Sequence, residues 1–379
     1  MHILITGGAG FIGSHTADAL IARGHRVTLL DNLHPTVHPN GKPSYLHPDA
    51  RFLQGDVRDA DTWRKALEGV EAVYHLAAYQ DYLPDFSTFF SVNAVSTALL
   101  YEVLVAEPTR FKVGKVVVAA SQAVMGEGRY RCPACSIQGD GDLFPDIRLE
   151  SQLAKGQWDH TCPACGNTLQ WQPSDEQVVR PCNQYALSKH SQEQIAIQLG
   201  RRYGIPSVAM RYSIVQGPRQ SFYNAYSGAM RIFALSLLLG QPPMIYEDGR
   251  QVRDFVNIAD VVEANCLVLD HPDAAYQVFN VGGGHAWTVA RFYDTMQQVV
   301  GKQLAPRMEG QYRYGDTRHI FSDTGRLQAL GWRPRRGVEE SIGDYWAYLT
   351  AHQEPREILD YAEKRMRRLN VIRQSGQAE

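Results

Sequence analysis

The sequence predicts an α/β fold, a doubly wound parallel sheet with a smaller C-terminal lobe and a cysteine-rich insertion. Three observations lead to this expectation. Apolar strand-like runs alternate with helical patterns in the first half of the 379-residue chain, which is the order of βαβ units. A glycine-rich turn follows the first apolar run, and two CxxC pairs interrupt the alternation further along.

The expected elements follow one another in a regular order. Strands are expected at 2–6, 26–30, 72–77, 115–121 and 207–212, and helices near 12–23, 60–68, 87–106 and 183–203. Beyond about residue 213 the pattern becomes irregular and is broken by Gly and Pro. We therefore expect a nucleotide-binding domain at 1–212 with an insertion at 129–177, a lobe at 213–350 that mainly binds substrate, and a helical tail at 351–379.

The first strand leads into the turn TGGAGFIGSH at 6–15. Gly7 and Gly10 allow a tight turn and a close approach to a pyrophosphate, while Gly13 allows the next helix to pack on the strand. A phosphate is then expected at the N-terminus of that helix. The turn therefore predicts a Rossmann dinucleotide-binding domain, with a surface glycine turn as the alternative interpretation.

The second strand ends in Asp31, about twenty residues after the glycines, where a carboxylate can bind the ribose hydroxyls of a dinucleotide. A carboxylate there repels a ribose 2′-phosphate, and the arginine typical of NADP sites is not beside it. The sequence therefore favours NAD as the cofactor.

Three residues form a candidate catalytic group. Tyr185 and Lys189 are four residues apart, so they share one face of the helix expected at 183–203. The lysine charge is expected to stabilise a phenolate and to lower the tyrosine pKa, which would make Tyr185 a general base. Ser121 ends the strand at 115–121, where its hydroxyl would bond the reacting oxygen. A solvated helix face is the alternative reading of the Tyr and Lys pair.

With these motifs the chain resembles the extended short-chain dehydrogenase/reductases that act on nucleotide sugars. The likeness runs from residue 1 to about 340 and includes Gly55-Asp56-Val57, His75-Leu76-Ala77-Ala78, Arg253-Asp254-Phe255-Val256 and Leu330-Gly331-Trp332-Arg333-Pro334. The resemblance implies a homodimer formed through the helices near 87–106 and 183–203. It also implies that the cofactor is contacted by Gly7, Gly10, Phe11, Ile12, Gly13, Asp31, Asn32, Asp56, Val57, Leu76, Ala77, Ala78, Asn93, Tyr185 and Lys189.

The residues after Ser121 bear on the reaction. The resembling 4,6-dehydratases have Asp-Glu at these positions, because elimination needs an additional acid or base. This chain has Gln122-Ala123, and an alanine cannot transfer a proton. We therefore expect a 4-epimerase that works through a 4-keto sugar. The alternatives are a reductase or dehydrogenase that uses NAD(H), and a non-catalytic NAD sensor that grips a partner with its insertion.

Four residues are expected to bind the substrate. Arg253 and Arg318 resemble family positions that clamp a nucleotide diphosphate, for which bidentate guanidinium contacts are suited. Surface ion pairs of these arginines with neighbouring aspartates are the alternative. Asp81 and Gln122 are expected to contact the sugar.

The separation of 64 residues between Ser121 and Tyr185 is larger than is typical of the family, and it contains Cys132, Cys135, Cys162 and Cys165. Four thiolates on two such turns predict a closed structural zinc site, with disulfides or unliganded thiols as alternatives. The resemblance is strongest to a ribbon-bearing subgroup, the dTDP-L-rhamnose 4-epimerases. We expect the insertion to form a flap beside the sugar cleft.

Charge and hydropathy limit the class of partner. The chain has 38 basic and 40 acidic residues, and the insertion carries four basic and seven acidic residues. An acidic ribbon repels a phosphate backbone, so nucleic acid is not an expected partner. No signal stretch and no apolar run of membrane-spanning length are expected, which predicts a soluble, cytoplasmic protein without a membrane partner.

Overall fold

A seven-stranded parallel sheet forms the centre of the molecule, in the order β12-β9-β5-β4-β1-β2-β3. The computed structural model describes residues 1–379 except 82, 136–140, 223–227, 353–363, 365 and 377–379. The strands are β1 (His2–Thr6), β2 (Arg26–Asp31), β3 (Arg51–Gln54), β4 (Ala72–His75), β5 (Lys115–Ser121), β9 (Ser207–Tyr212) and β12 (Gln277–Val281). The strand order reverses between β1 and β4, and ligands of open α/β sheets bind at such a point. The α/β class and its doubly wound sheet are confirmed.

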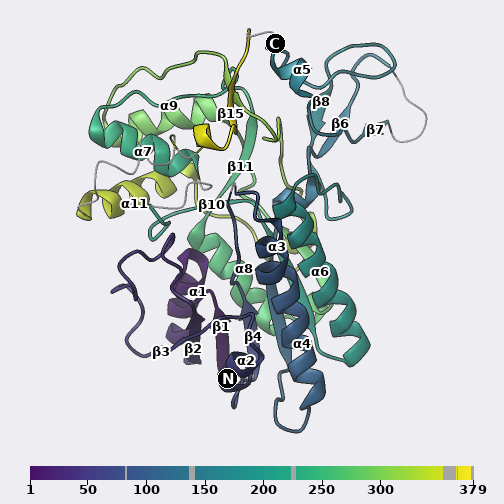
Figure 1. Ribbon diagram of the computed structural model, residues 1–379, viewed down its shortest axis with the longest axis vertical. Helices are drawn as coiled ribbons and strands as arrows, with labels where there is room; N and C mark the ends of the chain where they lie inside the picture. Colours follow the sequence, from purple (N-terminus) through teal and green to yellow (C-terminus); the bar gives the residue numbers. More distant parts are fainter. Residues whose placement is uncertain (82, 136–140, 223–227, 353–363, 365, 377–379) are drawn as a thin grey trace.

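Helices cover both faces of this sheet (Figure 1). One apolar cluster joins the sheet to α1 (Phe11–Ala22) and α8 (Ile258–Asp270). A second cluster joins its other face to α2 (Ala60–Ala66), α4 (Ser96–Ala106) and α6 (Gln184–Tyr203). The central strands β1, β4, β5 and β9 are buried on both sides, which explains why they read as continuous apolar runs rather than as alternating ones.

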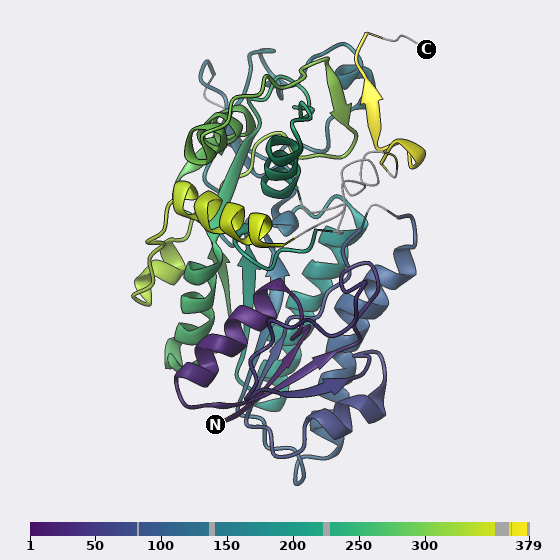
Figure 2. The same cartoon turned by 90° about the vertical axis from the view of Figure 1, so that its left-hand side faces the viewer.

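The smaller lobe lies beyond the carboxyl ends of the central strands (Figure 2). Its three-stranded sheet has the order β10-β11-β13, and β14 pairs antiparallel with β15. An apolar cluster that includes Phe233, Phe255 and Phe292 fills its core. Its elements are β10 (Ile214–Gln216), α7 (Ala229–Leu239), β11 (Val252–Asn257), β13 (Ala286–Thr288), α9 (Val289–Val300), β14 (Gln311–Arg313), α11 (Val338–Ala351) and β15 (Ile372–Gln374). Two short elements, η3 (Pro272–Ala274) and α10 (Gly325–Ala329), pack instead with α8 and with β12 of the central sheet.

The insertion at 129–177, here called the cysteine module, projects beside the lobe (Figure 1). It is a small antiparallel sheet in the order β7-β6-β8 with one short helix. Its elements are β6 (Arg129–Arg131), β7 (Asp142–Leu143), α5 (Glu150–Leu153) and β8 (Gln170–Gln172). The short helix η2 (Gln122–Met125) leads into the module directly from the end of β5. Its own small core contains Tyr130, Cys162 and Leu169.

Three features differ from the sequence-based expectation. Strands β3 and β12 were not expected, and β12 with α8 completes the central sheet although both lie beyond residue 212. The boundary at 212 therefore does not separate the sheet from the lobe. The described end of the tail is also not helical throughout, because β15 pairs with β14. That pairing supplies backbone partners which the local sequence does not reveal.

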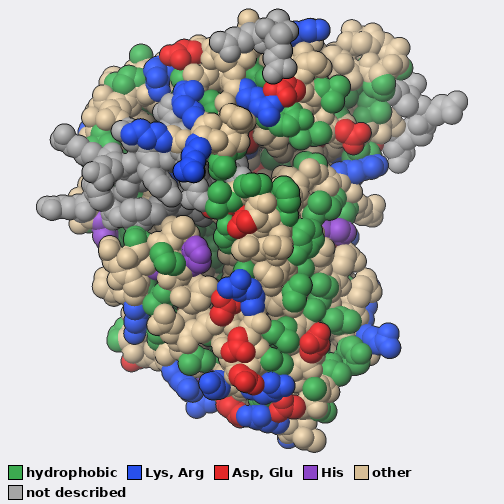
Figure 3. Space-filling view, viewed as in Figure 1, with side chains coloured by type: hydrophobic (Ala, Val, Ile, Leu, Met, Phe, Trp, Pro, Cys, Tyr) green, Lys and Arg blue, Asp and Glu red, His purple; other side chains and the backbone are tan. Residues whose placement is uncertain are grey.

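The expectation that no segment has membrane-spanning length was wrong for Phe86–Ala106. This helical segment comprises α3 (Phe86–Phe89), η1 (Phe90–Val95) and α4. It is long and apolar enough to cross a membrane by length and composition alone, and half of its most apolar window is buried inside the protein. Its buried residues pack on α6 in the core. Phe86, Val95 and Leu187 remain exposed, and Figure 3 shows apolar side chains gathered over this side of the molecule.

Candidate active site

A cavity of about 1290 Å³ lies between the carboxyl edge of the central sheet and the lobe. Pockets for drug-sized ligands typically have volumes of about 300–1,000 Å³, so this cavity is larger than a pocket for a single such ligand. It is lined by residues that follow β1, β2, β4, β5 and β9, and by α7 and the turns of the lobe. Strand ends that are far apart in the sequence therefore meet at one site.

The glycine turn shapes the floor of the cavity. Gly7 has a φ of +64°, and its carbonyl oxygen accepts a hydrogen bond from the Gly10 amide at 3.0 Å. A Cβ on Gly13 would lie 2.3 Å from the Gly7 carbonyl oxygen, so only glycine permits this packing. No side chain caps α1, which leaves amide donors at its N-terminus for an anionic group. These residues fit the pyrophosphate of NAD.

The carboxylate of Asp31 is fixed at the end of β2. It accepts hydrogen bonds from the amides of Ala9 at 3.0 Å and Leu33 at 2.9 Å. The cavity lining here also includes Asn32 and Asp56, and hydrogen bonds from Arg58 lower the pKa of Asp56 to about 2. Two fixed carboxylates suit ribose hydroxyls and oppose a 2′-phosphate, as expected for NAD.

Ser121, Tyr185 and Lys189 all line the cavity. Ser121 is the last residue of β5, and its hydroxyl hydrogen-bonds the Tyr185 phenol. The Lys189 Nζ donates to the Ala119 carbonyl oxygen at 2.7 Å and to Gln192 Oε1 at 2.8 Å. The three predicted catalytic residues therefore meet at one point of the cavity wall.

Burial, and not the charge of Lys189, has the largest effect on the pKa of Tyr185. Burial raises the pKa of Tyr185 to about 12, and only the hydrogen bond with Ser121 opposes the shift. Burial also lowers the pKa of Lys189 to about 7. Desolvation outweighs the lysine charge because the ammonium bonds Ala119 and Gln192 instead of the phenol.

Asn93 does not line the cavity, although the resemblance implied a cofactor contact. Its side chain is fully buried, donates to the Tyr79 carbonyl oxygen and to Ser188 Oγ, and accepts from the Tyr79 amide. It therefore fixes the loop after β4 against α6. The other residues expected to contact the cofactor do line the cavity, and they are Gly7, Gly10, Phe11, Ile12, Gly13, Asp31, Asn32, Asp56, Val57, Leu76, Ala77, Ala78, Tyr185 and Lys189.

Among the predicted substrate residues, Asp81, Gln122 and Arg253 line the cavity. Gln122 Nε2 donates to Ser322 Oγ at 2.7 Å, which orients its amide next to Ser121. Arg253 donates to the carbonyl oxygens of Val252 and Arg318, and burial lowers its pKa. A half-buried guanidinium held by carbonyl oxygens at the cavity wall is suited to an anionic ligand.

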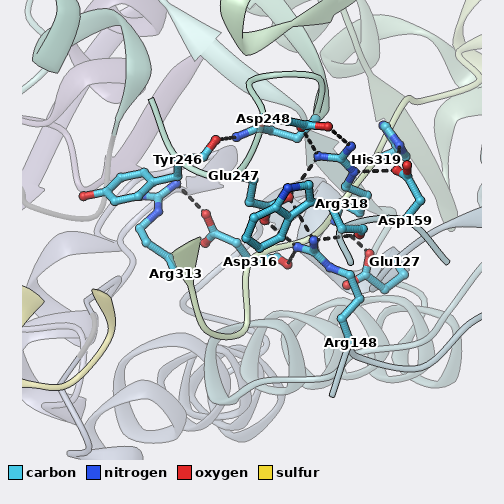
Figure 4. A network of polar contacts seen from close by, with 12 residues as sticks. Glu127, Arg148, Asp159, Tyr246, Glu247, Asp248, Arg313, Asp316, Arg318 and His319 are labelled. Atoms are coloured by element: carbon cyan, nitrogen blue, oxygen red, sulfur yellow. Dashed lines mark hydrogen bonds and ion pairs between the residues drawn. The ribbon is translucent and has the colours of Figure 1, made fainter. Parts of the chain in front are cut away.

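Arg318 is a correction, because its side chain is 1% exposed and does not line the cavity. Its guanidinium donates hydrogen bonds to the carboxylates of Asp159, Glu247 and Asp248 (Figure 4). Arg307 and Arg313 line the cavity instead. Arg313 was missed because the stretch Arg313-Tyr314-Gly315-Asp316-Thr317-Arg318 contains both an arginine that lines the cavity and one that is buried.

The four cysteines of the module come together. The Sγ atoms of Cys132, Cys135, Cys162 and Cys165 lie within 4.8 Å of one another, with hydrogen-bonded pairs at 3.4 to 3.6 Å. Zinc bonded to four thiolates at about 2.3 Å places the sulfurs about 3.8 Å apart. The cluster therefore fits a tetrahedral metal ion.

Comparison with known proteins identifies relatives over most of the chain. A model of the NAD dependent epimerase/dehydratase family matches residues 3–140 and 160–282, on either side of a gap inside the cysteine module. A dTDP-L-rhamnose 4-epimerase of Burkholderia thailandensis is 32% identical over 358 residues, which cover 92% of this chain and 94% of that protein. A putative UDP-glucose 4-epimerase of Methanocaldococcus jannaschii is 30% identical and covers 90% of this chain and 95% of its own.

Solved structures show the same fold. The UDP-glucose 4-epimerase of Thermotoga maritima with UDP-glucose has a TM-score of 0.75 at 27% identity, over 93% of this chain and 99% of that one. The UDP-glucose 4-epimerase of Thermus thermophilus in complex with NAD has a TM-score of 0.72 at 27% identity, over 93% and 100%.

Proposed function

Because this chain belongs to the NAD dependent epimerase/dehydratase family, we propose that it is an NAD-dependent nucleotide-sugar 4-epimerase. The observation that carries the proposal is the joint placement of Ser121, Tyr185 and Lys189 on one cavity wall. Ala123 follows in the position where an eliminating enzyme needs an acid or base. Close relatives with the name 4-epimerase support the same reaction.

In this mechanism Tyr185 takes the proton from the C4 hydroxyl and later returns it to the 4-keto oxygen. Ser121 bonds the same oxygen, and it already bonds the phenol. Lys189 fixes α6 to the end of β5 by donating hydrogen bonds to the Ala119 carbonyl oxygen and to Gln192 Oε1. NAD, which the residues of the glycine turn and Asp31 would hold, would supply a cationic, reversible hydride acceptor for C4. The sugar turns over in the cavity between the two transfers, so the proton and the hydride are both returned.

The lining residues suggest that one end of the cavity binds the dinucleotide and the other binds the substrate. The dinucleotide would be held by the glycine turn, Asp31 and the residues after β4. The nucleotide diphosphate of the substrate would be held by Arg253, Arg307 and Arg313 in the lobe. We infer that the sugar is dTDP-L-rhamnose or a related dTDP-6-deoxyhexose, which the 32% identity to the Burkholderia thailandensis enzyme supports.

The cysteine module is proposed to bind one structural zinc ion through Cys132, Cys135, Cys162 and Cys165, which the spacing of the four sulfurs supports. A homodimer is proposed through η1, α4 and α6, where Val95 of η1 and Leu187 of α6 are exposed. A cytoplasmic location and the absence of a nucleic-acid partner complete the proposal, since the net charge of the chain is only -2.

The test is incubation of the purified enzyme with a panel of dTDP- and UDP-sugars without added nicotinamide, followed by separation of the C4 epimers. We expect interconversion of one pair and no accumulation of reduced nicotinamide. Net reduction or oxidation of the sugar would instead show a reductase or dehydrogenase. If no sugar of the panel is converted, the epimerase assignment fails.

A further inference from the structure

A buried network of charges joins the cysteine module to the wall of the cavity (Figure 4). It begins at Arg148, which lies between β7 and α5 and is 2% exposed. Its guanidinium forms a bidentate pair with Glu247, at 2.9 Å to Oε2 and 2.8 Å to Oε1. The same guanidinium donates to the carbonyl oxygens of Trp158 at 3.0 Å and Asp316 at 2.7 Å. One side chain of the module is therefore tied to two turns of the lobe.

Glu247 is held in an unfavourable backbone conformation. Its φ is +55°, in the left-handed region that residues with a Cβ rarely adopt. Its carboxylate receives Arg148 on one side and Arg318 Nη1, at 2.9 Å, on the other. It directly follows Tyr246, which lines the cavity. The two arginines therefore hold a turn that shapes the cavity.

The network reaches the cavity arginines by two routes. Arg318 pairs with Asp159 of the module and with Asp248, and its carbonyl oxygen accepts a hydrogen bond from Arg253 at 3.1 Å. Asp316 accepts from Arg148 through its backbone and pairs through its carboxylate with Arg313 at 2.5 Å. Arg253 and Arg313 therefore both bond a residue that the module holds directly.

A separate contact ties the module to the strand of Arg313. Strand β15 pairs antiparallel with β14, which ends at Arg313. Arg373 of β15 forms an ion pair with Glu150 of α5. Just after β15, the Gly376 amide donates a hydrogen bond to the Ala154 carbonyl oxygen at 2.8 Å. The module is thus attached to the strand pair β14–β15 as well as to the turn of Glu247.

We propose that the cysteine module is a positioning element for Arg253 and Arg313, so that metal binding by its four cysteines sets the affinity of the cavity for a nucleoside diphosphate. This inference rests on the proposed function, and it adds the residues that carry the effect. The glycine turn, Asp31 and the Ser121, Tyr185 and Lys189 group take no part in the network. The module therefore acts on substrate affinity and leaves NAD binding and the chemical step unchanged.

The test compares Arg148→Met with Arg131→Met in the full-length protein. Arg131 is a matched control, because it pairs with Asp142 inside the module and is half exposed. Binding of UDP and of dTDP is measured by calorimetry, together with KM, kcat and NAD affinity. We expect Arg148→Met to raise both the diphosphate Kd and KM on the order of tenfold, with kcat and NAD affinity within about twofold of wild type. Arg131→Met should match wild type, and Arg148→Lys should lie between them because it keeps the charge without the bidentate fork.

Metal removal provides the second arm. Treating the wild-type protein with a chelator should raise the diphosphate Kd as Arg148→Met does, and should raise it less in Arg148→Met, since one connection is already lost. Two results would overturn the proposal. One is a folded Arg148→Met protein whose diphosphate Kd equals that of wild type, and the other is a wild-type protein whose diphosphate Kd does not change when the metal is removed. If neither Arg148 variant folds, the chelation result in the wild type decides. Because the Kd values of UDP and dTDP are measured without turnover, they remain readable if the sugar panel shows no epimerase activity.

Discussion

The Lys189 ammonium donates a 2.7 Å hydrogen bond to the carbonyl oxygen of Ala119, two residues before Ser121 on β5. This bond fixes α6 to the strand end from which Ser121 projects. Tyr185 lies one turn before Lys189 on the same helix, so its phenol meets the Ser121 hydroxyl. The lysine therefore sets the geometry of the acid-base pair in the protein, even though burial governs the pKa of the tyrosine.

Tyr185→Phe is expected to lower kcat about 10²- to 10⁴-fold, because it removes the group that exchanges the C4 hydroxyl proton. NAD binding should be kept, since the ring still fills its place in the wall. Steady-state kinetics and the NAD content of the purified protein measure the two effects. Tyr203→Phe, at the exposed end of the same helix, is the control and should behave as wild type. Comparable activity of the two variants would remove Tyr185 from the mechanism.

Lys189 should make the nucleotide-free protein more stable as the pH rises. Burial lowers its pKa from 10.5 to about 7, so the unfolded chain binds one more proton than the folded chain between these values. The free energy of unfolding should then increase by about 2 kcal/mol between pH 7 and pH 9 from this group. Urea denaturation of wild type and Lys189→Met measures the difference.

The control for this experiment is Lys155→Met, which changes an exposed lysine and should keep the wild-type slope. Identical slopes in wild type and Lys189→Met would mean that Lys189 does not titrate in this range.

Arg253→Met and Arg313→Met are expected to raise KM for the nucleotide sugar roughly 10- to 100-fold, since each removes charge-assisted bonds to the diphosphate. Arg318→Met should act differently, because it leaves the half-buried carboxylate of Asp248 without its guanidinium and the buried carboxylate of Glu247 with Arg148 alone. A loss of about 3–5 kcal/mol of stability is expected. Thermal denaturation and kinetics on the three variants separate the roles. A wild-type melting temperature for Arg318→Met would contradict the structural role of these ion pairs.

The purified chain should contain one zinc ion, measured by elemental mass spectrometry. Cys132→Ser together with Cys165→Ser should lose it, because two of the four sulfurs that lie within 4.8 Å of one another are replaced. Cys182→Ser, outside the cluster, should retain it. Full metal content in the double variant would contradict the four-thiolate site.

Local motifs predicted the parts of the site that local chemistry determines. The glycine turn, Asp31 at the end of β2, and Ser121 at the end of β5 each follow from one strand and the residue after it. The four cysteines were predicted because paired CxxC turns form a recognisable ligand set, and the sulfurs do come together.

Long-range packing accounts for what the sequence did not reveal. The tail strand β15 forms only because β14 supplies a partner about sixty residues away in the chain. Arg313 and Arg318 are five residues apart, and the carboxylates that pair with the second one, Asp159, Glu247 and Asp248, come from distant parts of the sequence. The partners of Asn93 on Tyr79 and Ser188 come from two other elements, so its position behind the cavity wall is not evident from the local sequence.

The most direct test of the central claim uses a nucleotide sugar carrying deuterium at C4, incubated with the enzyme and no added nicotinamide. A C4–H bond that breaks and re-forms within one closed cavity predicts that both C4 epimers keep the deuterium and that no reduced nicotinamide accumulates. Loss of deuterium to the solvent during epimerisation, or release of a 4-keto sugar with one equivalent of reduced nicotinamide, would contradict it.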